Sequence, residues 1–242
     1  MTDLSGQTVL VTGANRGLGR EFVTQLLERG VATVYAGARD PQSVEQTDDR
    51  VVAVQLDVTD PESVRRAAAT AEGVGIVVNN AGISLAGSLL ATDTTDLRRE
   101  LDVNLHGPLA VTAAFADSVR ERSGAVVNVA SALSWFALGG TYSVAKAALW
   151  AATDSLRLEL EPHGVQVLGV HMGYVDTDMT RGVDAPKVAA SDVVRQVLDG
   201  LEAGAREVLA DDTARGVKAT LHLPVEQRYA DFLPATAPAT AG

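Results

Sequence analysis

The sequence predicts an α/β protein: a doubly wound parallel sheet of about seven strands, with helices on both faces. Short β-branched segments alternate with longer segments of helical period at least six times along the chain. No internal repeat or long linker separates two cores, so we expect a single domain over residues 1–233. The tail over residues 234–242 has low complexity and is expected to be disordered.

Seven short segments have the length and β-branched content of buried strands. They are Thr8–Thr12, Thr33–Ala38, Val51–Gln55, Ile76–Val78, Ala125–Ala130, Val165–His171 and Glu207–Ala210. Helical period marks Arg20–Glu28, a helix opened by Asp60-Pro61-Glu62, Thr94–Val119 with an interruption near Val103–Pro108, Tyr142–Glu161, Ser191–Ala203 and Ala214–Leu221. Asp60 is a good N-cap, and Pro61 suits the first helical position.

Composition excludes several classes of function. The 242 residues are 46% apolar, which is enough for a sizeable core, and the net charge of −11 disfavours nucleic acid as a partner. The chain has no cysteine, so disulfides and thiol catalysis are excluded, and its four histidines lack zinc-site spacing, so no metal is expected. Without a signal-like start or an apolar run of membrane length, the expected location is the cytoplasm.

A glycine-rich segment lies between the first strand and the first helix. Its sequence is Gly13-Ala14-Asn15-Arg16-Gly17-Leu18-Gly19. Glycines at this point permit a tight turn and let a pyrophosphate approach the N–H groups at the start of a helix. The segment therefore predicts a dinucleotide site.

The residues after the second strand should meet the adenosine ribose of that dinucleotide. Arg39 is expected to bind the 2′-phosphate of NADP(H), helped by Arg16, because guanidinium groups donate to phosphate in a planar fork. The neighbouring Asp40 is the argument for NAD(H) as the less favoured cofactor. The alternative for Arg39 is an ion pair with Asp40 or contact with solvent alone.

Polar residues at the ends of later strands are further candidates. Asp57 could accept from the adenine amino group or could serve only as a turn carboxylate. The sequence Asn79-Asn80-Ala81-Gly82 would let a cofactor lie against the backbone. Asn104 is a polar residue in an apolar pattern, with either a structural hydrogen bond or a catalytic role.

Tyr142 and Lys146 are four residues apart, so a helix would place them on one face, one turn apart. An ammonium group stabilises a phenolate, so the pKa of Tyr142 is expected to fall toward the working pH. A surface pair with no chemical role is the alternative that spacing alone allows.

The ordered motifs resemble those of the short-chain dehydrogenase/reductase family over about Gly6 to Met179. Thr12–Gly19 matches T-G-x-x-x-G-x-G, Asp57-Val58 matches the adenine motif, and Asn79–Gly82 matches N-N-A-G. The resemblance implies a Rossmann-type fold, with Asn104, Ser131, Tyr142 and Lys146 as catalytic residues. The cofactor contacts it implies, with those inferred above, are Gly13, Asn15, Arg16, Gly17, Leu18, Gly19, Arg39, Asp57, Val58, Asn80, Ala81, Gly82, Tyr142, Lys146, Gly173, Val175 and Thr177.

In this resemblance Tyr142 exchanges the proton with the carbonyl or alcohol oxygen, and Ser131 polarises that oxygen. Lys146 lowers the pKa of Tyr142 and holds the nicotinamide ribose, while Asn104 holds a water of a proton relay. The implied activity is NADP(H)-dependent interconversion of a ketone or aldehyde and an alcohol, with reduction the favoured direction. An NADP-binding sensor without turnover is the alternative.

Two features depart from the family pattern. Ser131 and Tyr142 are closer in sequence than usual, which leaves Ser134 as a second candidate. Met172 stands where the family has proline, so the turn on the nicotinamide side is expected to differ.

The substrate pocket is expected at the loops that follow the strands. Besides Ser131 and Tyr142, its predicted lining is Trp135, Phe136 and Tyr174, and residues 174–190 are expected to form a mobile lid. Trp135 and Phe136 would form an apolar wall or, alternatively, pack against a helix or a second subunit. We expect a small apolar carbonyl substrate and, from the apolar helix Tyr142–Glu161, a homodimer or homotetramer.

Overall fold

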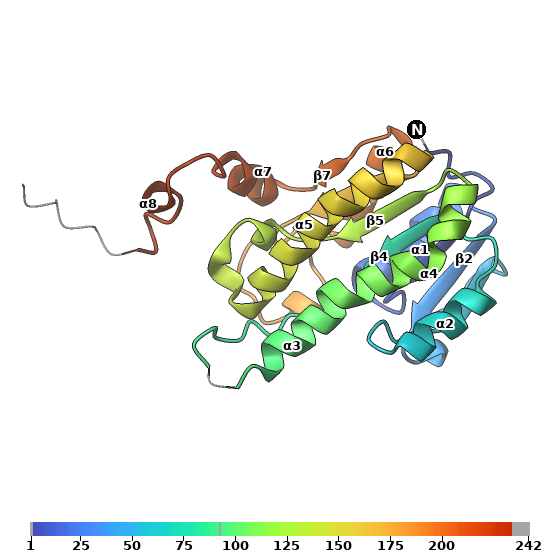
Figure 1. The fold of residues 1–242 in the computed structure, drawn as a ribbon, viewed down its shortest axis with the longest axis horizontal. Coiled ribbons are helices and arrows are strands. Elements are labelled where there is room, and N and C mark those ends of the chain that lie inside the picture. Colours follow the sequence, from blue (N-terminus) through green and yellow to red (C-terminus); the bar gives the residue numbers. More distant parts are fainter. Residues whose placement is uncertain (1, 92, 234–242) are drawn as a thin grey trace, which may run out of the picture.

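The computed structural model describes residues 2–91 and 93–233, and Figure 1 shows one sheet between two layers of helices. Seven parallel strands hydrogen-bond in the order β3-β2-β1-β4-β5-β6-β7. The chain therefore starts near the middle of the sheet, builds toward one edge, and then returns to build toward the other. The predicted doubly wound fold is confirmed, while the tail expected to be disordered lies outside the described residues.

The observed elements agree closely with the predicted ones. The strands are β1 Thr8–Thr12, β2 Thr33–Ala38, β3 Val51–Gln55, β4 Ile76–Asn79, β5 Ala125–Val129, β6 Gln166–His171 and β7 Glu207–Leu209. The helices are α1 Gly17–Glu28, α2 Pro61–Thr70, α3 Thr95–Leu101, α4 Gly107–Glu121, α5 Thr141–Leu160, α6 Ala190–Glu202, α7 Asp212–Ala219 and α8 Val225–Arg228. The main difference is that α1 begins inside the glycine-rich segment, before the periodic residues that predict it.

The two faces of the sheet hold separate cores. On one face, Phe22 and Leu26 of α1 pack with Val197 and Leu201 of α6. On the other face, α2, α4 and α5 cover the sheet, as Figure 1 shows. Strands buried on both sides explain why the sequence has unbroken apolar runs here rather than alternating ones.

A turn of π-helix joins α3 to α4 at Asp102–His106. This turn is the interruption that the sequence predicts near Val103–Pro108. It carries Asn104, which is fully buried. A π turn adds one residue to the helix and so redirects one side chain, and such turns are frequent at functional sites.

A row of buried polar side chains crosses the second core. Asn79 Nδ2 on β4 donates to Thr112 Oγ1 on α4 and to Asn128 Oδ1 on β5, both at 2.9 Å. Asn128 Nδ2 in turn donates to Thr153 Oγ1 on α5 at 2.9 Å. Buried amides need such partners, so the row fixes α4 and α5 in register with the strands between them. Across residues 2–91 and 93–233, no helix combines the length and the apolar character that crossing a bilayer requires.

Candidate active site

The predicted site residues gather at the carboxyl ends of the strands. In Figure 1 the strand arrows point toward the end of the molecule where the loops before α3 and α5 lie. β1 and β4 are neighbours in the sheet although two strands separate them in sequence. Ligands of open α/β sheets bind at such a switch point.

The glycine-rich segment forms a very tight turn between β1 and α1. Gly13 and Gly17 have positive φ angles of 65° and 53°, which favour glycine. A Cβ on Gly19 would lie 2.0 Å from the Gly13 carbonyl oxygen, so no side chain fits there. Arg16 precedes α1 without a side-chain cap, which leaves first-turn N–H groups free for an anion.

Hydrogen bonds tie this turn to the end of β4. The hydroxyl of Thr12 accepts from the backbone N–H groups of Asn80 and Ala81, both at 3.0 Å. The Asn80 amide donates to the Thr12 carbonyl at 2.9 Å and the Gly13 carbonyl at 3.2 Å. The structure thus brings the two predicted cofactor motifs together, and their close backbone approach fits a bound dinucleotide.

The segment after β6 reaches the same turn. A Cβ on Gly17 would lie 3.3 Å from Thr177 Cγ2, which places Thr177 beside the glycine-rich turn. Gly173 N donates to Asp211 Oδ2 at 2.7 Å, so the cap of α7 holds the turn where the family has proline. Two backbone hydrogen bonds join the base of the expected lid over residues 174–190. Val188 N donates to the Tyr174 carbonyl, and Asp176 N donates to the Val188 carbonyl, both at 2.9 Å.

Arg39 directly follows β2 and is exposed. Asp40 Oδ1 instead accepts from Gln42 N at 3.0 Å and caps the turn of 3-10 helix at Pro41–Ser43. Within the described part of the chain, no ion pair joins Asp40 to Arg39. Arg16 lies 3.8 Å from Asp178 in an exposed pair, so both predicted phosphate ligands remain accessible.

Asp57 follows β3, and its Oδ1 accepts from Thr59 N at 3.0 Å and from Thr59 Oγ1 at 2.7 Å. These bonds are those of the turn carboxylate that the sequence left as an alternative. Val58 packs so tightly on α4 that a Cβ on Gly107 would lie 2.7 Å from Val58 Cγ2.

Of the four residues predicted to be catalytic, Asn104 lies in the π turn and Ser131 in the loop after β5, while Tyr142 and Lys146 are both on α5. Asn104 exchanges two hydrogen bonds with the Ile83 backbone, at 2.9 and 3.2 Å. A Cβ on Gly82 would lie 3.0 Å from Asn104 Oδ1 and 3.8 Å from Lys146 Nζ, so glycine here lets these groups approach. Ser131 follows β5, where its hydroxyl accepts from Leu133 N at 3.1 Å.

Tyr142 and Lys146 lie one turn apart at the start of α5, as predicted. Lys146 Nζ donates to the Val129 carbonyl at 2.8 Å and lies 5.7 Å from the centroid of the Tyr142 ring. Burial lowers the pKa of Lys146 to about 8. Lys146 is buried, so Tyr142 and Lys146 are not a surface pair. The bonds of Asn104 to Ile83 are those of the structural alternative that the sequence left open for Asn104.

The expected fall in the pKa of Tyr142 is wrong for this structure. Burial raises the pKa of Tyr142 well above its ordinary value, the nearby Ser131 hydroxyl lowers it, and the Glu100 carboxylate raises it. The ammonium of Lys146 is directed to a backbone carbonyl instead of the phenol oxygen. Tyr142 therefore holds its proton firmly in the protein alone.

The three aromatic residues predicted for the substrate pocket lie in three different environments. Trp135 is buried and stacks on His171 at 3.9 Å between ring centroids, so the packing alternative applies to it. Phe136 stacks on Tyr229 at 4.8 Å between ring centroids. Tyr174 is 44% exposed at the start of the expected lid.

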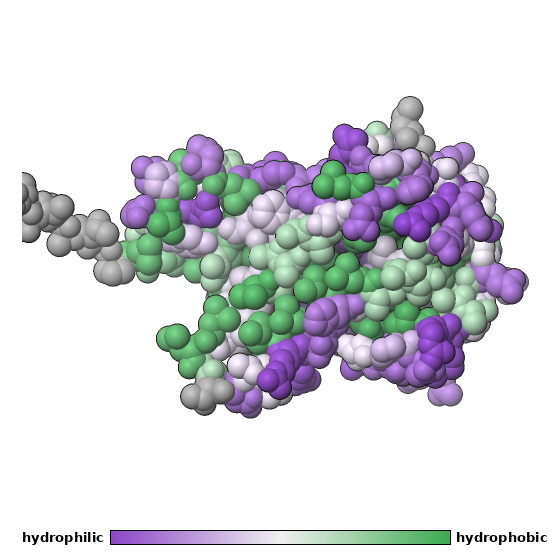
Figure 2. Space-filling model, viewed as in Figure 1, coloured by the Kyte–Doolittle hydropathy of each residue, from purple (hydrophilic) through white to green (hydrophobic). Residues whose placement is uncertain are grey.

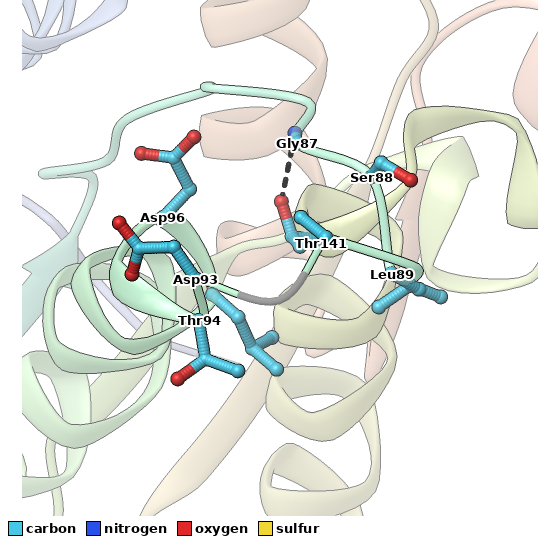
Figure 3. A pocket seen from close by; sticks show the side chains of 9 residues that line it. Gly87, Ser88, Leu89, Asp93, Thr94, Asp96 and Thr141 are labelled. Atoms are coloured by element: carbon cyan, nitrogen blue, oxygen red, sulfur yellow. Dashed lines mark hydrogen bonds between the residues drawn. The ribbon is translucent and has the colours of Figure 1, made fainter.

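The loop before α3 contacts Thr141, the residue that precedes Tyr142. Gly87 N donates to Thr141 Oγ1 at 2.9 Å, and Thr141 N donates to the Gly87 carbonyl at 3.0 Å. Figure 3 shows this contact at a pocket that Asp93 and Asp96 also line. The buried Glu100 supports the same loop, because its Oε1 accepts from Leu85 N at 2.6 Å.

His171 is a residue that the sequence reasoning missed. It is 1% exposed at the end of β6, and its Nδ1 lies 3.0 Å from the Ser131 carbonyl oxygen, to which it must donate. Burial lowers the pKa of His171 to about 4, so the ring is neutral at neutral pH. The signal was a polar residue closing the apolar strand V-Q-V-L-G-V-H.

Comparison with known proteins agrees with this geometry. A family model described as short chain dehydrogenase matches residues 7–187. The chain belongs to the short-chain dehydrogenase/reductase family. The match extends beyond the motifs themselves, through the segment after β6 that reaches the glycine-rich turn.

Individual relatives fall into the same family. Retinol dehydrogenase 5 of Mus musculus is 35% identical over 184 residues, which cover 71% of this chain and 58% of that protein. A ketoacyl reductase of a Nostoc strain is 33% identical over 218 residues, covering 83% of this chain and 76% of that protein. The chain thus spans only about three fifths of the retinol dehydrogenases that it matches.

Solved structures match over nearly the whole chain. A short chain dehydrogenase from Burkholderia cenocepacia, in complex with NADP, is 38% identical with a TM-score of 0.91, covering 97% of this chain and 100% of that one. An NADPH-bound carbonyl reductase from chicken fatty liver is 27% identical with a TM-score of 0.77, covering 85% and 97%.

The tight turn at Gly19 predicts a cofactor defect in Gly19→Ala. The added Cβ cannot fit against the Gly13 carbonyl, so the turn must shift away from the pyrophosphate position. We expect the Kd for NADPH, measured by calorimetry, to rise at least about tenfold, equivalent to roughly 1.4 kcal/mol. Gly216→Ala on α7, where a Cβ meets open space, is the matched control; equal Kd values in the two variants would contradict the assignment.

His171 predicts a specific acid sensitivity. Because its folded-state pKa of about 4 lies below the ordinary 6.5, the unfolded chain binds more protons between these pH values. The free energy of unfolding should therefore fall from about pH 6.5 down to about pH 4, by up to roughly 3 kcal/mol from this group. Urea unfolding of His171→Asn, which keeps a donor near Ser131, should lack this contribution; the exposed His106→Asn should keep it, and identical pH curves would refute the prediction.

Proposed function

We propose that this protein is an NADP(H)-dependent oxidoreductase that interconverts a ketone or aldehyde and an alcohol, with Tyr142 as the general acid and base. The observation that carries the proposal is the meeting of Asn104, Ser131, Tyr142 and Lys146 beside the glycine-rich turn. Membership of an oxidoreductase family and the NADP-bound neighbours support it. The contacts argue against a sensor without turnover, which does not require this set.

The nicotinamide cofactor, when bound, supplies or accepts the hydride. Tyr142 donates its hydroxyl proton to the substrate oxygen during reduction and takes it back during oxidation. Ser131 lies close enough to Tyr142 to influence its pKa, so one substrate oxygen can contact both hydroxyls. Lys146 keeps a nearby positive charge, which stabilises the tyrosinate left after proton donation.

The raised pKa of Tyr142 favours carbonyl reduction at neutral pH. The acid form is the one that reduction needs, and burial keeps Tyr142 in that form. Oxidation of an alcohol begins with the tyrosinate, which becomes accessible only at higher pH. The charge of Lys146, with its pKa of about 8, is present at neutral pH, where reduction is expected to be fastest.

The cofactor is proposed to be NADP(H) rather than NAD(H). Arg39 is exposed directly after β2, while Asp40 is engaged in capping the next turn. A guanidinium at this place suits the 2′-phosphate, and a capping carboxylate is a poorer partner for a ribose hydroxyl. Asp57 is proposed to contact the adenine through the carboxylate oxygen that Thr59 leaves free.

An apolar carbonyl compound is the proposed substrate class. Figure 2 shows apolar side chains at the end of the molecule where the strands terminate. The exposed apolar residues there include Leu85, Leu89, Leu138 and Phe232. The matched retinol dehydrogenases are named for a largely apolar alcohol, which supports this choice.

A homodimer or homotetramer is proposed as the working form. Exposed apolar residues continue along the outer face of α5, with Val144 39% and Leu158 80% exposed, and Figure 2 shows apolar side chains over α4 and α5. Burial of this face between subunits would remove it from water. The cytoplasm remains the proposed location.

Tyr142→Phe tests the mechanism. The variant loses only the hydroxyl, so kcat for carbonyl reduction should fall at least about 10²-fold while the Kd for NADPH stays nearly unchanged. The measurement is loss of NADPH absorbance over a panel of ketones and aldehydes. Tyr35→Phe, on β2 away from these residues, is the matched control. Substantial turnover by Tyr142→Phe would overturn the mechanism, and wild-type silence on every carbonyl with tight NADPH binding would favour the sensor.

Arg39→Ala tests the cofactor choice. Removal of the guanidinium should raise the Kd for NADPH at least about tenfold and leave the Kd for NADH nearly unchanged, because only NADPH carries the 2′-phosphate. Calorimetric titration with both cofactors measures the ratio. Arg20→Ala, an exposed arginine paired with Glu45, is the control. Equal losses for both cofactors would remove Arg39 from the 2′-phosphate site.

A further inference from the structure

The C-terminal segment contacts the loop that joins Ser131 to Tyr142. The ring of Phe136 in this loop stacks on Tyr229 with centroids 4.8 Å apart and an interplanar angle of 11°. Phe232 meets the same ring edge-on at 5.7 Å. The backbone N–H of Ala137 donates to the Tyr229 hydroxyl at 3.1 Å. Three contacts from one segment therefore converge on two adjacent residues of the loop.

The two ends of this loop are fixed from inside the protein. At one end, His171 binds the Ser131 carbonyl and stacks on Trp135. At the other end, Ser143 Oγ accepts from Gly139 N at 2.9 Å and donates to the Phe136 carbonyl at 3.0 Å. Phe136 is thus one hydrogen bond from the residue that follows Tyr142. The middle of the loop, Ala137 and Leu138, is exposed.

The C-terminal segment is itself attached to the sheet. Asp211 caps α7 and also accepts from Gly173 N, and Lys218 on α7 pairs with Glu207 on β7. The Lys218 ammonium lies 5.3 Å from the centroid of the Trp135 ring. Arg228 Nη2 donates to the Leu221 carbonyl at 2.6 Å, which joins α8 to the end of α7. The segment that contacts Phe136 is therefore anchored to the sheet through α7.

We infer that Tyr229 and Phe232 form an aromatic clamp on Phe136 that positions the Ser131–Tyr142 loop and limits the size of the carbonyl compound that reaches Tyr142. The inference rests on the proposed function. Tyr229 and Phe232 are positioning residues, since they act on Tyr142 through Phe136 and Ser143. A rigid loop keeps the hydroxyls of Ser131 and Tyr142 aligned on the oxygen of a small carbonyl substrate. A loose loop admits a substrate with a bulkier apolar group, but the two hydroxyls are then less well aligned on its oxygen.

The decisive variant is Tyr229→Phe, which keeps the stacked ring and removes only the hydroxyl that binds Ala137 N. Hydrogen exchange of peptides covering residues 132–141 should be faster in this variant than in wild type, by roughly the 2- to 10-fold expected for one lost hydrogen bond. Tyr35→Phe on β2 is the matched control and should leave exchange of these peptides unchanged. Unchanged exchange in Tyr229→Phe overturns the clamp whether or not the wild type reduces a carbonyl.

Kinetics then decide whether the clamp acts on the substrate. In Tyr229→Phe, kcat for a small carbonyl such as propanal should fall about 2- to 10-fold, while the Kd for NADPH stays constant. The kcat/KM ratio of a bulky apolar aldehyde to propanal should rise by a similar factor, and further in Tyr229→Leu, which also loses the stack. Faster exchange with an unchanged ratio overturns the effect on substrate size.

The same experiments separate failure of the clamp from failure of the proposed function. A wild-type protein that binds NADPH but reduces no carbonyl refutes the function, and the role of the clamp in substrate size with it. If the wild type reduces carbonyls and Tyr229→Phe matches it in hydrogen exchange and in kinetics, the clamp is refuted and the proposed function stands. If Tyr229→Leu does not fold, Tyr229→Phe and Phe232→Leu still decide, because both keep an apolar side chain on Phe136.

Discussion

The contact between the ends of β1 and β4 is the constraint on which the site depends. Two strands and their helices separate these segments in sequence, yet the sheet order makes them neighbours. Thr12 and Asn80 then bind each other's backbone, which sets the glycine-rich turn against Asn80-Ala81-Gly82. The start of α1 and the small residues after β4 consequently face one space, where a dinucleotide can lie.

The same geometry brings the groups proposed for proton transfer to that space. Gly82 continues from the β4 end and leaves room for Asn104 and Lys146 to approach. The π turn at Asp102–His106 directs Asn104 inward, and the row of buried amides and hydroxyls holds α4 and α5 on the strands. A shift of either helix would leave buried polar groups without partners, so the relative positions of Asn104 and Tyr142 are well determined.

Burial controls the electrostatics of the site more strongly than the Tyr142–Lys146 spacing does. Desolvation raises the pKa of Tyr142 and lowers that of Lys146, and the ammonium binds a carbonyl instead of the phenol oxygen. In the protein alone the proton therefore stays on Tyr142, which agrees with the proposed direction of reduction. His171, kept neutral by its own burial, donates to the Ser131 carbonyl at the start of the loop. The C-terminal segment contacts Phe136 further along the same loop.

The sequence by itself determined the strand and helix order, because buried parallel strands and amphipathic helices leave distinct apolar periods. It also determined the motif residues, since glycine, tyrosine and lysine at those spacings have few other uses together. Only the tertiary structure decided the pKa values, because desolvation depends on what covers a residue and not on its neighbours in sequence. For the same reason the packing of Trp135 on His171 and of Phe136 on Tyr229 could not be predicted: those partners lie more than thirty residues away and meet only when the sheet has formed.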